Sequence, residues 1–343
     1  MEKLIGRGSS KSMAQLGNMN IISIGELEGQ LGVLKWPKFI AACEREFGDR
    51  INQIADRLIA DTRLKAVFVS GPTASGKTTF SDRLTRILID RGRPTHLISL
   101  DDYYHTDTAR FDDKGRPDFE SIDTLDTKQI VKDFHDLLCG RRVQLPSFNF
   151  VTRRRYFDPK KNIKLGSDEV MLVEGLHGLS DLIAGRISHG QWLGVYIMPW
   201  CKLLDSRRLL DGRELRMLRR ISRDVLHRGA TALSTIDYWP MIDRTEQEFF
   251  PQYLARADEY VNSSLNYEYC VIAPLAARQI EVSLRQYERG CLPGSMYLQN
   301  QSGYADLSQA IAAARDLLHA CERIPSADRS VVPAQSILNE FIQ

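Results

Sequence analysis

Short apolar runs alternate with segments of helical periodicity along most of the chain. The runs are rich in Val, Ile, Leu and Phe and are bounded by polar or turn residues, as is typical of strands buried on both faces. They occupy residues 64–69, 95–100, 170–173, 193–198 and 268–273. Strands separated by helices are joined by crossover connections, so we expect an α/β fold with a parallel sheet and helices on both of its faces.

Other segments have helical spacing or no regular pattern. Apolar positions recur at helical spacing in residues 37–58, 77–91 and 307–321, and a short apolar tail lies at 337–342. Two long spans, 103–124 and 146–166, carry few periodic signals and many Asp, Arg, Pro and Gly residues. We expect these spans to be long loops above the sheet that wall a substrate site.

The chain divides into three parts by composition and pattern. Residues 1–60 form a leader and an N-terminal helical appendage, residues 61–290 contain all the predicted strands, and residues 291–343 form a C-terminal helical extension. At 343 residues and 43% hydrophobic, the chain can bury a full core. We therefore expect one large domain with additions at both ends.

A glycine-rich motif, Ser-Gly-Pro-Thr-Ala-Ser-Gly-Lys-Thr-Thr at residues 70–79, joins the first predicted strand to a helix. In this setting G-x-x-x-x-G-K-T is typical of the phosphate-binding loop of P-loop NTPases. Glycine lets the backbone approach phosphate, and the start of the helix favours an anion. We expect ATP or GTP here, with Lys77 on the β- and γ-phosphates and Thr78 on Mg²⁺. The expected nucleotide-binding residues are Gly71, Pro72, Thr73, Ala74, Ser75, Gly76, Lys77, Thr78 and Thr79.

Charge and cysteine content narrow the class of protein. Lys and Arg number 46 against 44 Asp and Glu, a net charge of +2, so no global field favours nucleic acid or a membrane surface. The six cysteines are scattered without a C-x-x-C pair, which argues against a zinc site or disulfide framework and favours a reducing cytoplasm. No apolar run reaches membrane-spanning length, and residues 1–15 contain no secretory apolar core.

Acidic residues follow two of the predicted strands. Asp101 comes directly after the strand at 95–100, and Glu174 directly after the strand at 170–173. Because ligands bind at the carboxyl ends of parallel strands, we expect both carboxylates to face one Mg²⁺. A neutral hydroxyl acceptor also needs a carboxylate base, for which Asp101 is the candidate. The alternative for Asp101 is a helix cap or turn residue.

Eight arginines lie between residues 207 and 228. Without the P-loop, a basic helix would be interpreted as a solvated face. Beside a P-loop, we interpret it as an Arg-rich helical lid that closes over the transferred phosphoryl group, neutralises its charge and excludes water. The arginines of this lid include Arg219, Arg220, Arg223 and Arg228.

These motifs resemble the uridine kinase and phosphoribulokinase family of P-loop kinases over residues 64–274. Beyond the P-loop, the resemblance is carried by residues 99–104, 118–126, 145–150, 173–175 and 220–229. Residues 24–27, 54–58 and 332–338 are similar to a branch of the family that has a threonyl-tRNA-synthetase-like N-terminal extension, most of which is absent here.

The resemblance implies ATP-dependent phosphorylation of a nucleoside 5′-hydroxyl, as in uridine or cytidine kinases. The catalytic residues that it implies are Asp101, Lys77, Arg223 and Arg228. The Mg²⁺ ligands are Thr78, Asp101 and Glu174. The substrate-binding residues are Asp123, Tyr104, Phe148, Arg153 and Arg220. Asp123 would hold ribose hydroxyls, although on its own it could equally be a solvated loop aspartate.

Departures from the family pattern leave the acceptor open. Uridine-cytidine kinases read the pyrimidine with a Tyr and a His where this chain has Phe148 and Arg153, and Ala230 replaces a further lid arginine. Phe148 can stack on a ring but cannot hydrogen-bond, and the basic run 153–155 could bind an acidic group or form an exposed loop.

Three functions therefore stay open. The first is a cytoplasmic nucleoside kinase whose partners are ATP and a small-molecule acceptor. The second is a P-loop kinase of an anionic hydroxyl acceptor. The third is a nucleotide-binding regulatory or RNA-associated protein, suggested by the synthetase-like segments and the arginine helix. The sequence does not determine whether the chain forms a homo-oligomer.

Overall fold

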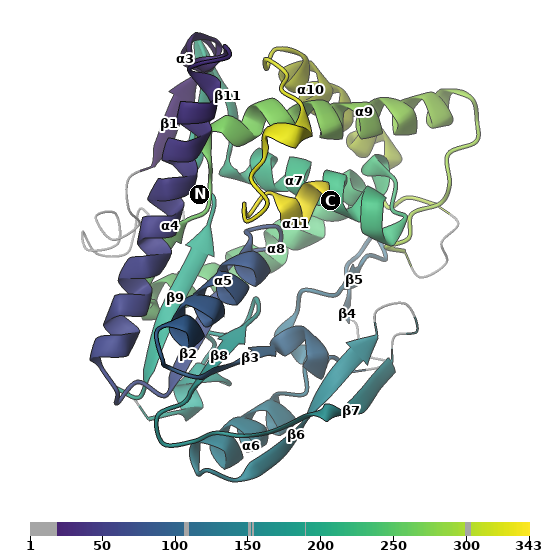
Figure 1. The fold of residues 1–343 in the computed structure, drawn as a ribbon. Helices are drawn as coiled ribbons and strands as arrows, with labels where there is room; N and C mark the ends of the chain where they lie inside the picture. The colour runs from purple at the N-terminus through teal and green to yellow at the C-terminus, as the bar shows by residue number, and fades with distance from the viewer. Residues whose placement is uncertain (1–18, 106–109, 150–151, 153, 189, 299–302) are drawn as a thin grey trace.

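Five parallel strands form the central sheet of the protein (Figure 1). The computed structural model describes residues 19–105, 110–149, 152, 154–188, 190–298 and 303–343. The strand order is β12-β9-β2-β8-β3, and every neighbouring pair is parallel. The strands are β2 (Ala66–Ser70), β3 (Thr95–Ser99), β8 (Val170–Glu174), β9 (Trp192–Met198) and β12 (Glu259–Asn262). The strand that precedes the P-loop therefore lies in the middle of the sheet.

Helices cover both faces of this sheet, as predicted. On β2, Val67 and Val69 belong to one apolar cluster, and Ala66 and Phe68 to another, because successive side chains point to opposite faces. The first cluster includes side chains of α4 (Trp36–Ala60) and α5 (Lys77–Asp90), and the second those of α6 (Thr127–Leu138) and α8 (Ala232–Arg256). Burial on both faces makes β2, β8 and β9 continuous apolar runs. With the edge strand β3, which is only partly buried, four of the five predicted strands are confirmed.

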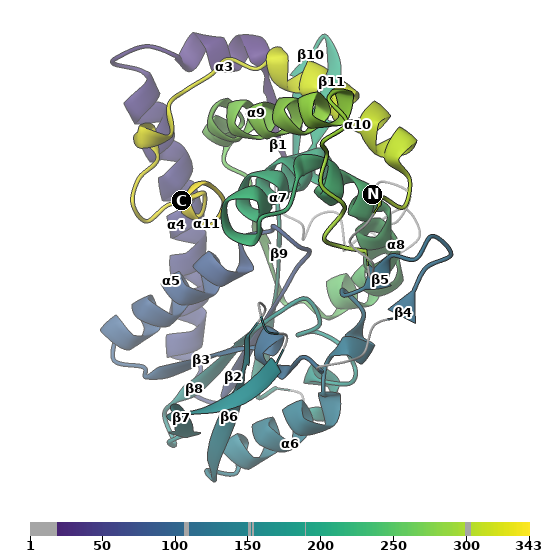
Figure 2. The ribbon, with the colours of Figure 1, turned by 90° about the vertical axis from the view of Figure 1, so that its right-hand side faces the viewer.

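A second sheet, two antiparallel ribbons and a helical layer complete the described fold. The second sheet has the order β1-β10-β11, formed by β1 (Asn20–Ser23), β10 (Cys201–Asp205) and β11 (Arg207–Asp211). The ribbons are β4 (Arg110–Phe111) with β5 (Pro117–Asp118), and β6 (Arg142–Asn149) with β7 (Arg154–Lys164). The other helices are α3 (Ile24–Gln30), α7 (Gly212–Arg228), α9 (Tyr269–Glu288), α10 (Leu307–Glu322) and α11 (Asn339–Ile342). Figure 2 shows α9 and α11 beside α7, which both of them contact.

The fifth predicted strand, residues 268–273, is wrong. This segment lies at the start of α9, where Cys270, Val271, Ile272 and Ala273 are all fully buried. A helix buried on every side has the same continuous apolar run as a buried strand. The fifth strand is β12, a four-residue edge strand with the sequence Glu-Tyr-Val-Asn, which is too short and too polar to be found by its pattern.

The predicted long loop at 146–166 is also wrong, because most of it belongs to the β6–β7 hairpin. The strands pair from Arg142 with Lys164 to Asn149 with Arg154, with an irregularity between Gln144 and Pro146. Nearly all side chains of β7 are exposed or half-buried on both faces, so the alternation that marks a strand is missing. The described part of 103–124 contains only short turns and the β4–β5 ribbon, in agreement with the prediction of a loop.

One apolar cluster joins the three predicted parts of the chain. Ile51 of α4, Val67 of β2 and Phe341 of α11 all belong to it. The boundaries at residues 60 and 290 stay a prediction, but the parts they separate share a core. The N-terminal and C-terminal additions therefore contribute to the packing around the P-loop.

Candidate functional site

The P-loop follows β2 and takes a backbone path that only small residues permit. A Cβ added to Gly71 would lie 2.0 Å from the carbonyl oxygen of Ile197, in the neighbouring strand β9. Gly76 has a φ of +85° and Ala74 a φ of +56°, both in the left-handed region. This conformation is unfavourable for a non-glycine residue and is typical of functional sites. The loop is therefore held in a shape that lets a ligand approach the backbone closely.

We expect Gly71→Ala to destabilise the protein, because the added methyl group overlaps the Ile197 carbonyl. Overpacking of this kind costs about 1–3 kcal/mol. Gly25→Ala in α3 is the matched control, since no atom lies within 4 Å of the added Cβ there. Chemical denaturation of both variants measures the difference, and equal losses of unfolding free energy would contradict the expectation.

The start of α5 presents backbone donors that its own N-cap does not satisfy. The N-cap residue Gly76 has no side chain that could accept a hydrogen bond, and the first N–H groups of a helix have no intrahelical partner. Lys77 Nζ donates to the Pro72 carbonyl oxygen at 2.9 Å. Ser75 Oγ is buried without a hydrogen-bond partner among the described residues. With the exposed hydroxyl of Thr78, these groups form a cradle for an anion.

Three buried arginines of α7 donate hydrogen bonds to oxygen atoms of the P-loop. Arg216 donates to the carbonyl oxygen of Thr73 at 3.3 Å, and Arg219 donates to that of Ala74 at 3.2 Å. Arg220, predicted to bind substrate, donates to Thr73 Oγ1 at 2.8 Å. Each guanidinium is also paired with a carboxylate, which neutralises its charge inside the protein. These pairs are Arg216–Glu246, Arg219–Glu268 and Arg220–Glu120.

The two arginines that we expect at the phosphates, Arg223 and Arg228, converge on Asp224. Their guanidinium groups lie 2.8 Å and 3.6 Å from Asp224 Oδ1, and Tyr297 donates to Oδ2 at 2.5 Å. Burial would raise the pKa of the Asp224 carboxyl, but Arg223, Arg220 and Arg228 outweigh it and lower the pKa to about 2. The end of α7 is thus a cationic cluster built around one buried anion, and Arg228, with 44% of its side chain exposed, is open to a ligand.

Asp101 and Glu174 meet at the carboxyl ends of the neighbouring strands β3 and β8. Ser99 connects them, because its hydroxyl donates to Glu174 Oε1 at 2.6 Å and accepts the Asp101 N–H at 3.3 Å. Burial, followed by the charge of Asp101, raises the pKa of Glu174 to about 7 against the opposing effect of Lys77. Burial of its carboxyl also raises the pKa of Asp101, against the opposing charge of Lys77. Other atoms of Asp101 are exposed to solvent. A cation between these two carboxyls would favour the charged form of both.

This set of oxygens fits Mg²⁺. The ion takes one or two carboxylates from the protein and completes its octahedron with waters and substrate phosphates. Asp101, Glu174 and the Thr78 hydroxyl supply donors of that kind beside the P-loop. In the described ranges, no group of three His, Cys, Asp or Glu side chains is arranged to hold a metal without such phosphates. A Mg²⁺ held by Asp101, Glu174 and Thr78 would leave its other positions to waters and to the phosphates of a nucleotide.

Glu120 is a charged residue of the site that the sequence did not single out. Its carboxylate lies 3.0 Å from Arg220. Burial would raise its pKa, but Arg220, Lys77 and Arg228 lower it below the ordinary value, so Glu120 stays ionised among the cations. It belongs to the acidic segment 118–126, but nothing in its spacing distinguishes it from the other acidic residues there.

Tyr104 and Phe148, two of the predicted substrate residues, lie together beside the β6–β7 hairpin. Their ring centroids are 5.6 Å apart. Asp102 fixes the hairpin, since its Oδ1 accepts the Phe148 N–H at 3.0 Å and its Oδ2 pairs with Lys161 at 2.6 Å. Such an aromatic pair can pack against a planar ring. Arg153, predicted for the same wall, lies outside the described residues.

Asp123 lies in the 3₁₀ turn Ile122–Thr124 and forms an ion pair with Arg110. Its side chain is 49% exposed, so the carboxylate is accessible to a ligand. This position agrees with a role in binding ribose hydroxyls. It agrees equally with the alternative that Asp123 is a solvated aspartate of a loop.

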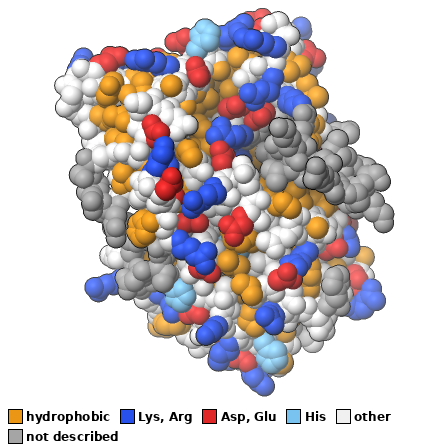
Figure 3. All heavy atoms as spheres, turned by 180° about the vertical axis from the view of Figure 1, so that it is seen from behind, with side chains coloured by type: hydrophobic (Ala, Val, Ile, Leu, Met, Phe, Trp, Pro, Cys, Tyr) orange, Lys and Arg blue, Asp and Glu red, His pale blue; other side chains and the backbone are white. Residues whose placement is uncertain are grey.

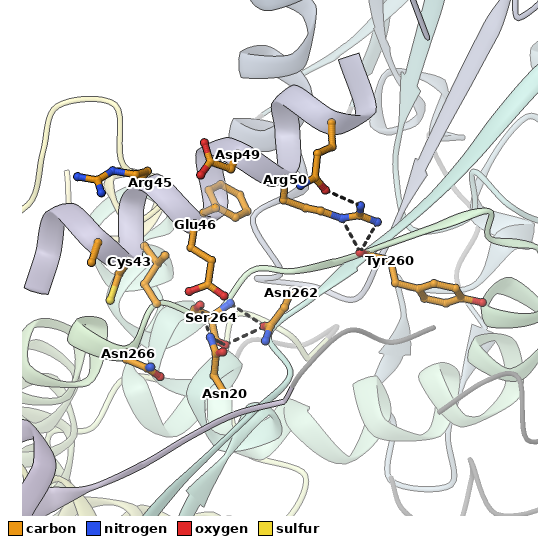
Figure 4. Close-up of a pocket in the computed structure, with 14 residues that line it drawn as sticks. Asn20, Cys43, Arg45, Glu46, Asp49, Arg50, Tyr260, Asn262, Ser264 and Asn266 are labelled. Atoms are coloured by element: carbon orange, nitrogen blue, oxygen red, sulfur yellow. Dashed lines mark hydrogen bonds between the residues drawn. The ribbon is translucent and has the colours of Figure 1, made fainter. Parts of the chain in front are cut away.

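A separate hollow of about 510 Å³ lies between α4 and the edge strand β12 (Figure 4). Figure 4 shows Arg50 reaching the carbonyl oxygen of Tyr260, to which its Nε donates at 3.2 Å. The arginine thereby satisfies a backbone acceptor at the open edge of the sheet. The residues that line this hollow differ from those predicted for the phosphate site.

Basic and acidic side chains intermingle on the face shown in Figure 3. This mixture agrees with the near-neutral net charge and gives that face no broad field of one sign. Within the described ranges, no helix combines the length and apolar character needed to cross a membrane.

Comparison with known proteins relates this site to a family. The sequence model described as "Phosphoribulokinase / Uridine kinase family" matches residues 67–264. Similar proteins include a uridine kinase of Macrococcus caseolyticus, 26% identical over 178 residues that cover 51% of this chain and 76% of that protein. A uridine kinase of Mycoplasma genitalium is 29% identical over 197 residues, covering 55% and 80%. The solved structure of a possible uridine kinase from Bacillus stearothermophilus aligns with a TM-score of 0.43 and 18% identity, covering 63% of this chain and 98% of that one.

The matched segment, more than half of the chain, contains the P-loop, both strand-end carboxylates, the arginine helix α7 and most of the central sheet. The fold is that of an α/β P-loop NTPase, and the chain belongs to the Phosphoribulokinase / Uridine kinase family of ATP-dependent phosphotransferases.

Proposed function

We propose that this protein transfers the γ-phosphoryl group of ATP to the 5′-hydroxyl of a nucleoside. The observation that carries the proposal is the meeting of Asp101 and Glu174 at neighbouring strand ends, where the Ser99 hydroxyl joins them, beside the P-loop and its Lys77. A cationic phosphate cradle next to a candidate base is what phosphoryl transfer to a neutral hydroxyl requires. Similarity to proteins named uridine kinase supports the choice of a nucleoside.

In this proposal the nucleotide phosphates lie against the P-loop backbone and Lys77. Mg²⁺, when bound through Thr78, Asp101 and Glu174, neutralises charge on the β- and γ-phosphates. Arg223 and Arg228 face the transferred group, since Asp224 keeps both at the end of α7. Their charges oppose the negative charge that spreads over the phosphoryl oxygens during transfer.

The acceptor hydroxyl gives its proton to Asp101. The raised pKa of this carboxyl brings it closer to that of an effective base at neutral pH. The base of the nucleoside packs against Tyr104 and Phe148, and Asp123 accepts hydrogen bonds from the ribose hydroxyls in place of Arg110. The faces of these aromatic rings do not form base-specific hydrogen bonds. Tyr104 and Phe148 would therefore favour any flat ring and would discriminate little between one base and another.

The reaction is assigned to the cytoplasm. The six cysteines are scattered along the chain without a C-x-x-C pair, and Cys43, Cys201, Cys270 and Cys321 are buried, which supports a reducing compartment.

The proposal is tested by a coupled ADP-release assay with Mg·ATP and a panel of acceptors. We expect turnover with uridine or cytidine. We expect none with 5′-deoxyuridine, which keeps the base and both ribose hydroxyls but lacks the accepting group. Turnover only with sugar phosphates or hydroxy acids would contradict the proposal, as would tight ATP binding without turnover on any nucleoside.

A further inference from the structure

The C-terminal tail reaches the P-loop and places a carboxylate on its backbone. Glu340 of α11 accepts two hydrogen bonds at Oε2, from the Thr79 N–H at 3.3 Å and from the Thr79 hydroxyl at 3.0 Å. Ile337 lies against the loop itself, since a Cβ added to Gly76 would be 2.2 Å from Ile337 Cδ1. The last helix of the described chain is therefore in direct contact with the first turn of α5.

The tail is firmly anchored around this contact. Ser336 Oγ lies 3.1 Å from the hydroxyl of Tyr267, and the guanidinium of Arg219 lies 5.0 Å from the ring centroid of Phe341. These anchors are made by Ser336 and Phe341 and do not involve the half-buried side chain of Glu340. The buried apolar side chains of the tail are Ile337, Leu338, Phe341 and Ile342.

Thr79 belongs to the turn of α5 whose N–H groups lack intrahelical partners. The helix begins at Lys77, and the bond from the Phe80 N–H to the Gly76 carbonyl oxygen, at 3.1 Å, closes its first turn. The Thr79 N–H precedes that bond, so it is one of the free donors that a P-loop offers to nucleotide phosphates. A carboxylate and a phosphate cannot both accept a hydrogen bond from this N–H, because two anions within hydrogen-bonding distance of the same donor repel each other.

We propose that Glu340 is an internal competitor of the nucleotide, which holds a phosphate-binding donor of the P-loop until nucleotide phosphates displace its side chain. This inference rests on the proposed ATP site. The competition concerns phosphate and not the adenine base. It therefore lowers the affinity of every ligand that places phosphate on Thr79, and it does so by the same factor whatever other contacts the ligand makes.

Isothermal titration of the wild type, Glu340→Gln and Glu322→Gln with Mg·ATP, tripolyphosphate and adenosine tests the inference. Glu340→Gln keeps the shape of the side chain and an acceptor oxygen but removes the charge. Glu322 is an exposed residue of α10, so its variant makes the same change in net charge on a solvated surface. We expect Glu340→Gln to bind Mg·ATP and tripolyphosphate roughly 2- to 30-fold more tightly, the range given by one carboxylate at a helix start. Adenosine binding, and all binding by Glu322→Gln, should match the wild type.

Weaker binding of Mg·ATP by Glu340→Gln would overturn the inference, because it would make Glu340 a support of the loop. Unchanged binding would overturn it too, as would an equal gain for adenosine. Failure of the wild type to bind Mg·ATP would instead refute the proposed ATP site, and the inference with it. Thermal unfolding shows whether each variant is folded. If Glu340→Gln is not folded, Glu340→Ala replaces it. This variant should also bind phosphate ligands more tightly than the wild type.

Discussion

Asp101→Asn will lower kcat by roughly 10²- to 10⁴-fold with a nucleoside acceptor, while Mg·ATP still binds. The amide keeps the size of the side chain but cannot take the proton of the acceptor hydroxyl. The phosphate contacts of the P-loop backbone and Lys77 are unaffected, so nucleotide affinity should change much less than turnover. Single-turnover measurements and a nucleotide titration on the same variant separate the two quantities.

The control for this variant is Asp113→Asn, which changes an exposed aspartate between β4 and β5. We expect its kcat to equal that of the wild type. If Asp101→Asn retained full turnover, Asp101 would not be the base. If it lost turnover only in proportion to nucleotide affinity, its role would be confined to the metal.

Arg219→Met will lower the free energy of unfolding by about 3–5 kcal/mol, because it leaves a buried carboxylate without a counter-ion. Arg219 and Glu268 are both fully buried and form two parallel hydrogen bonds of 2.8 Å. The arginine also satisfies the carbonyl oxygens of Ala74 and Ser263, which the methionine leaves unpaired. Urea denaturation measures the loss.

The matched control for this change lies on the same helix. Arg213 pairs with Asp243 at 2.6 Å, but its side chain is 39% exposed. We expect Arg213→Met to cost no more than about 1 kcal/mol, because exposed ion pairs contribute little. Similar costs for the two variants would show that burial does not govern the Arg219 pair.

The sequence predicted the three inner strands of the sheet well because they are buried on both faces. Residues 170–173 and 193–198 are continuous apolar runs, and they form β8 and β9. The same signal misled at 268–273, where a fully buried helix gives an identical run. The β7 strand gave no signal at all, since solvent reaches both of its faces. The local pattern of apolar residues therefore indicates how deeply a segment is buried. It distinguishes a strand from a helix only where the burial differs between the two.

The candidate site could be predicted only where its residues are neighbours in the sequence or directly follow a predicted strand. The P-loop residues are consecutive, and the strand-end position identified Asp101 and Glu174. The partners of the arginines could not be found in this way, because Glu268 is 49 positions from Arg219 and no local pattern relates them. Glu340, 261 positions from Thr79, was beyond reach for the same reason.

The buried arginines of α7 restrict how the site can close on its substrate. A swing of the whole helix would separate Arg216 and Arg219 from the P-loop oxygens and from their carboxylates at the same time. The part of α7 that is most open to a ligand is its final turn, where Arg228 is 44% exposed and the helix ends at the cap residue Gly229, with a φ of +67°. A closure compatible with these contacts would be the rearrangement of a short segment, on the nanosecond to microsecond scale of loops, and not a slower domain movement.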